Sequence, residues 1–217
     1  MAGIPQAFPE TGGSAVASYD STDLAEGAGR VAYNLAGTQV SGSVLTKFLT
    51  RSSLYSSSSE VSGAVSSSGQ QSDLDFDITY LLPQNLSGTC YVNIPHFCAA
   101  GGIAGTDTGY LIVRLRHYDG TTETTLASNI SPTISSTAGV SASSQIVCVP
   151  LIGTQHFKVG DSLRLTVEAW QDHGSGAAGI FAYGIDPANR STAYLNSIAN
   201  NPGSSKSTVY VPFRLDP

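Results

Sequence analysis

Residues 160–169, GDSLRLTVEA, are the stretch that decides the fold. The Gly-Asp pair predicts a turn, and Leu163, Leu165 and Val167 then alternate with polar side chains. A period of two residues is that of a strand with one buried and one exposed face. The stretch therefore predicts an antiparallel strand.

Seven further segments have the pattern of short strands. They are residues 73–82, 89–97, 110–118, 121–127, 145–152, 178–185 and 207–215. Asp119-Gly120 is typical of a two-residue type I′ hairpin turn, and Pro95 indicates an edge or a bend. Residues 128–144 are expected to be a loop. Eight short strands with long loops between them fit a jelly-roll sandwich better than a meander barrel.

The first 72 residues have weaker patterns. Residues 1–29 show no sustained periodicity and predict an extended N-terminal arm. Residues 30–36 favour a strand, residues 44–49 have apolar spacing typical of one or two helical turns, and the Ser-rich run 53–72 predicts a loop or linker. The predicted class is all-β, an eight-stranded antiparallel jelly-roll sandwich with an extended N-terminal arm. Its parts are an arm (1–29), short elements with a Ser-rich linker (30–72) and a jelly-roll domain (73–217).

The composition requires a surface built from uncharged polar residues. Only 12% of the 217 residues are Asp, Glu, Lys or Arg, while 41% are hydrophobic and 23 are Gly. Helices normally solvate their outer faces with charged residues, whereas Ser, Thr and Gly suit strands and turns. The composition therefore disfavours a helical protein, and a secreted adhesin or carbohydrate-binding domain would share it.

Charge and apolar patterning exclude several partners. The net charge is −6 and no run of Lys or Arg occurs, which argues against nucleic-acid binding. No apolar segment approaches the roughly 20 residues needed to cross a bilayer, and the first residues lack the pattern of a secretion signal. We expect no nucleic-acid partner and no membrane partner.

The late part of the chain resembles trimeric jelly rolls of the tumour necrosis factor type. In that family a Gly-Asp turn, here Gly160-Asp161, precedes an alternating strand, and an aromatic apolar strand, here Tyr210, Val211 and Phe213, ends the chain. With its Ser/Thr/Gly-rich composition and Pro/Gly-rich arm, the chain also resembles decoration, cement or head-fibre proteins of tailed double-stranded DNA viruses. The resemblance covers residues 73–217 and implies a homotrimeric virion structural protein.

Asp107-Thr108-Gly109 is identical to the tripeptide that carries the catalytic carboxylate of aspartic proteases. That chemistry needs two carboxylates that share a proton, so a single copy would require a symmetric dimer. In that family the tripeptide follows an apolar strand, but here it follows AAGGIAGT. We expect a plain turn and no catalytic residue.

Asp73, Asp75 and Asp77 are expected on one face of a strand, about 7 Å apart per two residues. A hard cation such as Ca²⁺ would relieve their repulsion. Because Leu74 and Phe76 favour a strand over a calcium loop, we expect a solvated outer face, and a bound cation is the alternative.

Three cysteines leave one thiol over, so they predict no disulfide framework. His96 and Cys98 would point the same way on a strand, and Cys90 and Cys148 could approach them, as in a zinc site. No paired C-x-x-C spacing occurs, so buried packing is the expectation and we predict neither a metal nor a cofactor.

Trp170, Tyr183 and Tyr194 are expected near loops, where exposed aromatic rings stack on sugars in glycan-binding sandwiches. Core or subunit-interface positions are the favoured interpretation. Neither a G-x-S-x-G elbow nor a P-loop occurs, so hydrolase and nucleotide chemistry have no support in the sequence.

These observations predict a non-enzymatic viral structural protein that is made in the host cytoplasm and assembles on the capsid or tail surface. Its expected partners are copies of itself, as a homotrimer, and the major capsid protein or another virion component. The alternative is a receptor- or glycan-binding module of a viral tail or fibre. The candidate assembly contacts are Ile4, Phe8, Val16, Tyr210 and Phe213.

Overall fold

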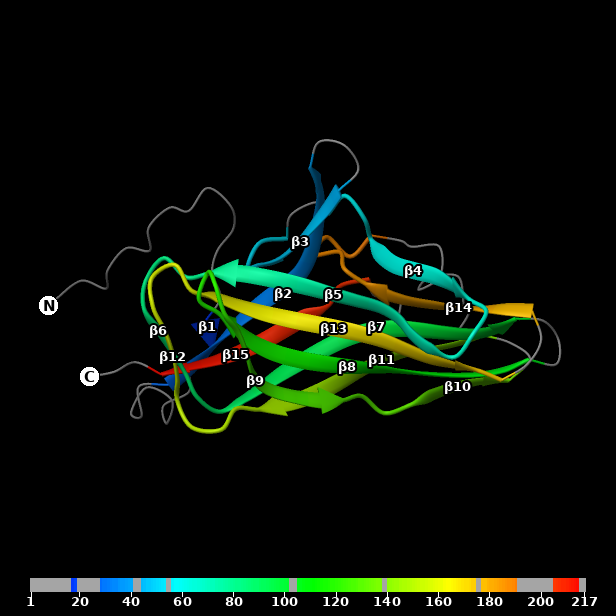
Figure 1. The fold of residues 1–217 in the computed structure, drawn as a ribbon. Coiled ribbons are helices and arrows are strands. Elements are labelled where there is room, and N and C mark those ends of the chain that lie inside the picture. The colour runs from blue at the N-terminus through cyan, green and yellow to red at the C-terminus, as the bar shows by residue number, and fades with distance from the viewer. Residues whose placement is uncertain are drawn as a thin grey trace, which may run out of the picture.

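The protein is all-β in the computed structural model (Figure 1). The model describes residues 17–18, 28–40, 44–53, 56–101, 105–137, 140–174, 177–190 and 205–214. In these ranges the chain forms fifteen strands and no helix, so they contain no helix that could cross a membrane. The all-β prediction is confirmed, whereas the predicted count of eight strands is too low.

The strands in chain order are β1 (Ala17–Ser18), β2 (Ala28–Val40), β3 (Val44–Thr50), β4 (Glu60–Val65), β5 (Gly69–Thr79), β6 (Gln84–Leu86), β7 (Thr89–Gly101), β8 (Thr106–Tyr118), β9 (Glu123–Ile130), β10 (Ile134–Thr137), β11 (Val140–Pro150), β12 (Gln155–Phe157), β13 (Ser162–His173), β14 (Ala177–Gly184) and β15 (Thr208–Arg214).

The strands lie in two layers (Figure 1). The first layer contains β10, β8, β13 and β5, and the second contains β15, β7, β14 and β4. Strands β3 and β2 connect the two layers, because β3 pairs with β5 and β2 pairs with β15. One buried apolar cluster fills the space between the layers, with Phe76, Val113 and Leu165 from the first layer and Val92 and Val209 from the second. Burial of this shared core is what holds the layers together.

Strand β13 confirms the prediction made from residues 160–169. It pairs with β5 on one side and β8 on the other. Leu163, Leu165 and Val167 are each at most 1% exposed, and Gly160 in the preceding turn has a φ of 92° that only glycine adopts freely.

Three loop or helix predictions are wrong. The residues expected to form helical turns are strand β3, whose hydrogen bonds come from its hairpin with β2, whereas a helix of two turns would be marginal alone. The Ser-rich run 53–72 contains β4, which pairs with β14, and the start of β5. The expected loop 128–144 contains β10 and parts of β9 and β11. In β4 the small side chains of Ser62 and Ala64 are exposed, so this strand has little apolar pattern.

The Asp119-Gly120 hairpin is longer than the predicted two-residue turn. Tyr118 pairs with Glu123, so the loop contains four residues. The Asp119 carboxylate accepts hydrogen bonds from the N–H groups of Thr121 and Thr122 at 2.9 and 2.6 Å. This side-chain bonding stabilises a wider turn than the dipeptide alone indicates.

Pro95 lies where β7 changes partner. Residues 91–93 of β7 pair with β15, and pairing with β14 begins at His96. Because proline has no N–H to donate, it is tolerated at the point between two partners.

Candidate assembly face

Four side chains form a row across the outer face of the second layer. Tyr210 on β15 lies opposite Ala32 on β2 and opposite Tyr91 on β7, and Tyr91 lies opposite Cys148 on β11. Tyr210 is 43% exposed, and Cys148 is exposed as well. We call these four residues the tyrosine face.

Alternation along each strand explains why these side chains point outward. The residues on either side of them in the chain belong to the core or, for Val31, pack half-buried against it: Val31, Tyr33, Cys90, Val92, Val147, Val149, Val209 and Val211. Since successive residues of a strand point to opposite faces, burial of these neighbours places the row on the outside.

The tyrosine face contains no ionisable acid or base other than its phenols and thiol. Arg30 lies beside it, with its guanidinium 5.1 Å from the centroid of the Tyr91 ring. Exposed tyrosine with a flanking arginine is the composition found at the centre of protein interfaces.

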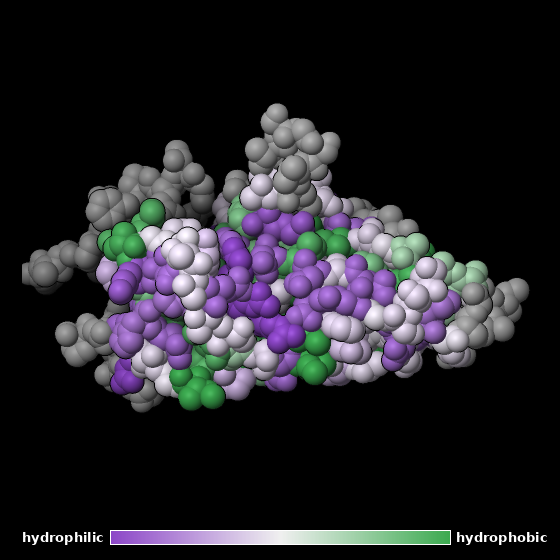
Figure 2. All heavy atoms as spheres, in the orientation of Figure 1, coloured by the Kyte–Doolittle hydropathy of each residue, from purple (hydrophilic) through white to green (hydrophobic). Residues whose placement is uncertain are grey.

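The outer face of the first layer has the opposite character, and hydrophilic side chains cover it in Figure 2. Arg164 on β13 donates to both oxygens of Asp77 and lies 3.4 Å from Asp75 and 2.9 Å from Glu123. Thr166 also donates to Asp75, at 2.6 Å. Asp75 and Asp77 therefore share Arg164 as a cationic partner. Asp73 instead lies opposite Glu168, and burial together with the Glu168 charge raises its pKa.

The other predicted assembly contacts are Ile4, Phe8, Val16 and Phe213. Ile4, Phe8 and Val16 lie outside the described residues. Phe213 packs half-buried against the core, on the side of β15 opposite to Tyr210.

Asp107 lies in strand β8, where a turn was expected, and that prediction is wrong. Its buried carboxylate accepts hydrogen bonds from Gln171 Nε2 at 2.9 Å, from His173 Nδ1 at 2.9 Å and from the N–H of Gly174 at 3.1 Å. A Cβ at Gly179 would lie 1.9 Å from Asp107 Oδ2, so glycine there makes room for the carboxylate. With its oxygens committed to these donors, Asp107 is held as a structural group.

The candidate zinc ligands are not brought together. Cys90 and Cys98 are buried, and burial raises the pKa of each thiol to about 12. Burial also lowers the pKa of His96. Cys148 lies on the outer face, and no group of three or more His, Cys, Asp or Glu in the described ranges could hold a metal ion.

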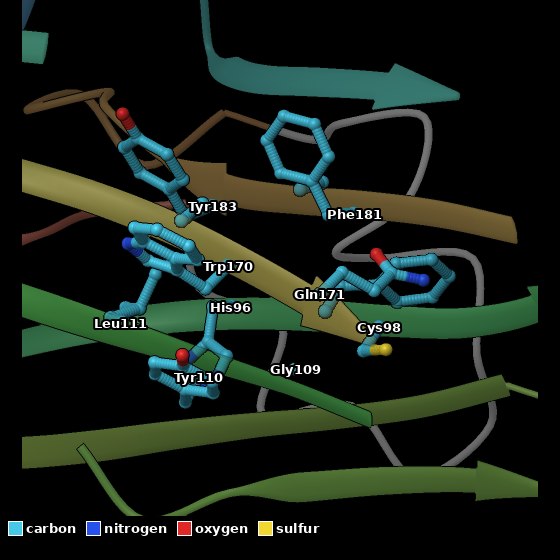
Figure 3. A pocket seen from close by; sticks show the side chains of 12 residues that line it. His96, Cys98, Gly109, Tyr110, Leu111, Trp170, Gln171, Phe181 and Tyr183 are labelled. Carbon is cyan, nitrogen blue, oxygen red and sulfur yellow. The ribbon is translucent and has the colours of Figure 1, made fainter. Parts of the chain in front are cut away.

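The interior near His96 contains a cavity of about 10 Å³ (Figure 3). Residues of β7, β8, β13 and β14 surround it, among them Cys98, Leu111 and Phe181. His96 and Gln171 also line it, and neither His96 Nε2 nor Gln171 Oε1 has a hydrogen-bond partner among the described residues. A volume of about 10–15 Å³ holds one water molecule, so the cavity is too small for an organic substrate.

The aromatic residues occupy unlike sites. Trp170 lies on the outer face of β13, nearly parallel to Tyr110, with ring centroids 6.4 Å apart, and its Nε1 donates to Glu168 at 3.0 Å. Tyr183 is fully buried, and Tyr194 lies outside the described residues.

Two histidine pairings have no signal in the sequence. His117 Nε2 lies 2.7 Å from Asp161, and His173 pairs with Asp107. Each pair joins strand segments far apart in the chain, so only the fold could show it.

Comparison with known proteins gives no family for this chain. No protein-family model and no curated protein matches it. Among solved structures, a CocE/NonD family hydrolase from Staphylococcus aureus aligns at 11% identity over 83% of this chain and 36% of the hydrolase, with a TM-score of 0.46. The chain thus spans about a third of that protein. The Eiger TNF of S. frugiperda aligns at 10% identity over 76% of this chain and 98% of that protein, with a TM-score of 0.27.

Proposed function

We propose that the chain is a non-enzymatic virion structural protein that forms a homotrimer through the tyrosine face and assembles on a capsid or tail surface. The observation that carries this proposal is the difference between the two outer faces. One has a network of paired charges, and the other has Tyr91, Cys148 and Tyr210 partly or fully exposed to solvent. An uncharged aromatic face on a two-layered domain is typical of a surface covered by a partner.

The jelly-roll form of the fold is part of the same proposal. Consecutive strands lie in different layers at β4–β5, β7–β8 and β13–β14, so the chain crosses repeatedly between the layers. Such crossing is expected of a jelly roll and not of a meander, whose consecutive strands pair with each other.

The chemistry of the interior supports a structural role. Asp107 is saturated by three donors, and the Cys90 and Cys98 thiols have pKa values too high for a thiolate at neutral pH. These three interior groups therefore provide no accessible activated group of the kind that catalysis requires.

Mass spectrometry of purified virions tests the virion role. We expect the chain in many copies per particle, retained after washing in high salt. Its absence from particles made by cells that express the gene would contradict the proposal.

A second function is favoured by Trp170 and Tyr110. Their nearly parallel rings lie on an outer sheet face, an arrangement that can stack on a sugar ring. A glycan array tests this receptor- or glycan-binding alternative, and binding that is lost in Trp170→Ala and kept in Tyr210→Ala would favour it.

A further inference from the structure

An open groove of about 430 Å³ runs between β4 and strands β3 and β5. Val61, Leu74 and Phe181 give it apolar walls. Glu60 Oε2 in the wall is shielded from solvent and has no hydrogen-bond partner within the described ranges. A groove with apolar walls and an unpaired polar atom suits a polypeptide segment, which supplies both kinds of contact.

The backbone of β4 has one edge that no described strand pairs with. Among the described strands β4 pairs with β14 alone, and the Ser59 carbonyl accepts the N–H of Ile185 at 3.0 Å. Bonded and non-bonded positions alternate along an antiparallel pair. Since Ser59 is a bonded position, the N–H and C=O groups of Glu60, Ser62 and Ala64 point away from β14. Ser58 Oγ donates to the Glu60 carbonyl at 2.7 Å, which agrees with a Glu60 carbonyl that points away from β14.

This edge lacks the usual protection against pairing. Edge strands normally carry lysine, proline or a bulge that prevents another strand from adding. The sequence of β4, EVSGAV, has one charged residue and no proline, and the small side chains of Ser62 and Ala64 are exposed. Across the groove, β5 meets β3 only at Asp77, so most of its edge on that side is also unpaired within the described strands.

Residues 4–10, IPQAFPE, have a backbone pattern that matches the free edge. Pro5 and Pro9 are four residues apart, so in an extended segment their nitrogens, which carry no hydrogen, lie on the same edge. The opposite edge is formed by the N–H and C=O groups of Gln6, Phe8 and Glu10. Three residues of this segment can therefore pair with three residues of β4. The other edge of the segment contains Pro5 and Pro9, which have no N–H, so a further strand cannot add to it.

We propose that residues 4–10 of a neighbouring copy lie in the groove as an added strand on β4. This inference rests on the self-assembly proposed above. The chain is fixed at Ala17–Ser18, where β1 pairs with the start of β2, near one end of the molecule, and β4 lies toward the other (Figure 1). A segment anchored there is placed for the groove of a neighbour. Lys47 also lines the groove.

A labelled peptide of residues 2–16 tests occupancy of the groove by fluorescence anisotropy. It is titrated into the full-length Phe8→Pro variant, whose own segment lacks the pairing N–H. We expect saturable binding that is weakened at least tenfold by an added Ser62→Pro and unchanged by an added Ser62→Thr, which keeps the N–H. The same peptide methylated on the Phe8 nitrogen keeps the side chain and should not bind. Absence of binding to Phe8→Pro, or equal binding with Ser62→Pro, would overturn the proposal.

Mixing two variants tests whether the segment comes from a neighbour. Full-length Phe8→Pro and Ser62→Pro chains both also carry Tyr210→Asp, so that the tyrosine face does not join them. Each alone should have the single-chain mass of 22.4 kDa by light scattering, and their mixture should form a complex of twice that mass. If the peptide binds but the mixture stays at single-chain mass, the neighbour as source is wrong. That outcome leaves the tyrosine-face trimer standing, because the comparison of Tyr210→Asp with Tyr210→Phe in the Phe8→Pro background tests it separately.

Discussion

Arg164 on β13 and Asp77 on β5 form a two-point ion pair across neighbouring strands. Arg164 Nε donates to Asp77 Oδ1 at 2.8 Å, and Nη2 donates to Oδ2 at 2.7 Å. The flat guanidinium matches the carboxylate in two parallel hydrogen bonds, a geometry that lysine cannot reproduce. Because Arg164 also lies near Asp75 and Glu123, it is the centre of the charged outer face.

Replacement of Arg164 by alanine should lower the free energy of unfolding by about 1–2 kcal/mol, since three carboxylates lose their shared cation. Urea unfolding at pH 7 measures the change. Arg214→Ala, at an exposed position on β15, is the control and should change stability by less than about 0.5 kcal/mol. Equal losses in the two variants would contradict the role given to Arg164.

Stability should fall in acid partly through Glu168. Burial acts to raise the pKa of this carboxyl, but hydrogen bonds from Arg114 and Trp170 outweigh it, so the folded-state pKa lies below the ordinary 4.5. A lowered pKa adds stability that is complete above about pH 4.5 and is lost as pH falls through the folded-state pKa. Glu168→Gln should therefore show a smaller difference in unfolding free energy between pH 7 and pH 3 than the natural chain. An unchanged difference would refute this assignment.

Gly179→Ala should destabilise the protein by at least about 2 kcal/mol, because the new methyl group overlaps the Asp107 carboxylate and the carbonyl of Ala99. Gly109→Ala is the control, a glycine replacement with a milder overlap. Its Cβ would lie 3.3 Å from the Cys98 side chain, which can shift, so the loss should be clearly smaller. Thermal unfolding of both variants separates the two cases, and the reverse order would show that Asp107 is not fixed as described.

Alkylation followed by mass spectrometry should find one reactive thiol in the native protein. Cys148 is exposed, whereas burial raises the pKa of Cys90 and Cys98 to about 12 and leaves little thiolate at pH 8. If the tyrosine face is covered by self-association, the labelling rate of Cys148 should fall as protein concentration rises. A rate independent of concentration would argue that this face stays open.

The alternating strands could be predicted because one of their faces is buried. In β13 and β8 every second residue is apolar, which sequence periodicity detects directly. Strand β4 was not predicted because it is an edge strand of small residues. Strand β3 was not predicted because its apolar residues are spaced as in a helix. Local pattern carries no information about an edge whose hydrogen bonds come from a distant strand.

The candidate site was predictable only in part. Tyr210 stands between Val209 and Val211, so alternation alone indicates an exposed tyrosine on the last strand. Its meeting with Tyr91 and Cys148 depends on the register of strands far apart in the chain, which no local pattern contains. Asp107 was wrongly predicted to lie in a turn because its tripeptide is polar. In the fold it lies in a strand, and three donors distant in the sequence form hydrogen bonds with its buried carboxylate.

The mass of the protein in solution tests the central claim most directly. Light scattering across concentrations should give three times the single-chain mass of 22.4 kDa for the natural sequence. In the Phe8→Pro background, which removes arm exchange, Tyr210→Asp should give the single-chain mass, because it places a charge in the middle of the tyrosine face, while Tyr210→Phe should stay trimeric. A natural chain that stays at 22.4 kDa at every concentration, or a variant with Phe8→Pro and Tyr210→Asp that stays trimeric, would contradict assembly through this face.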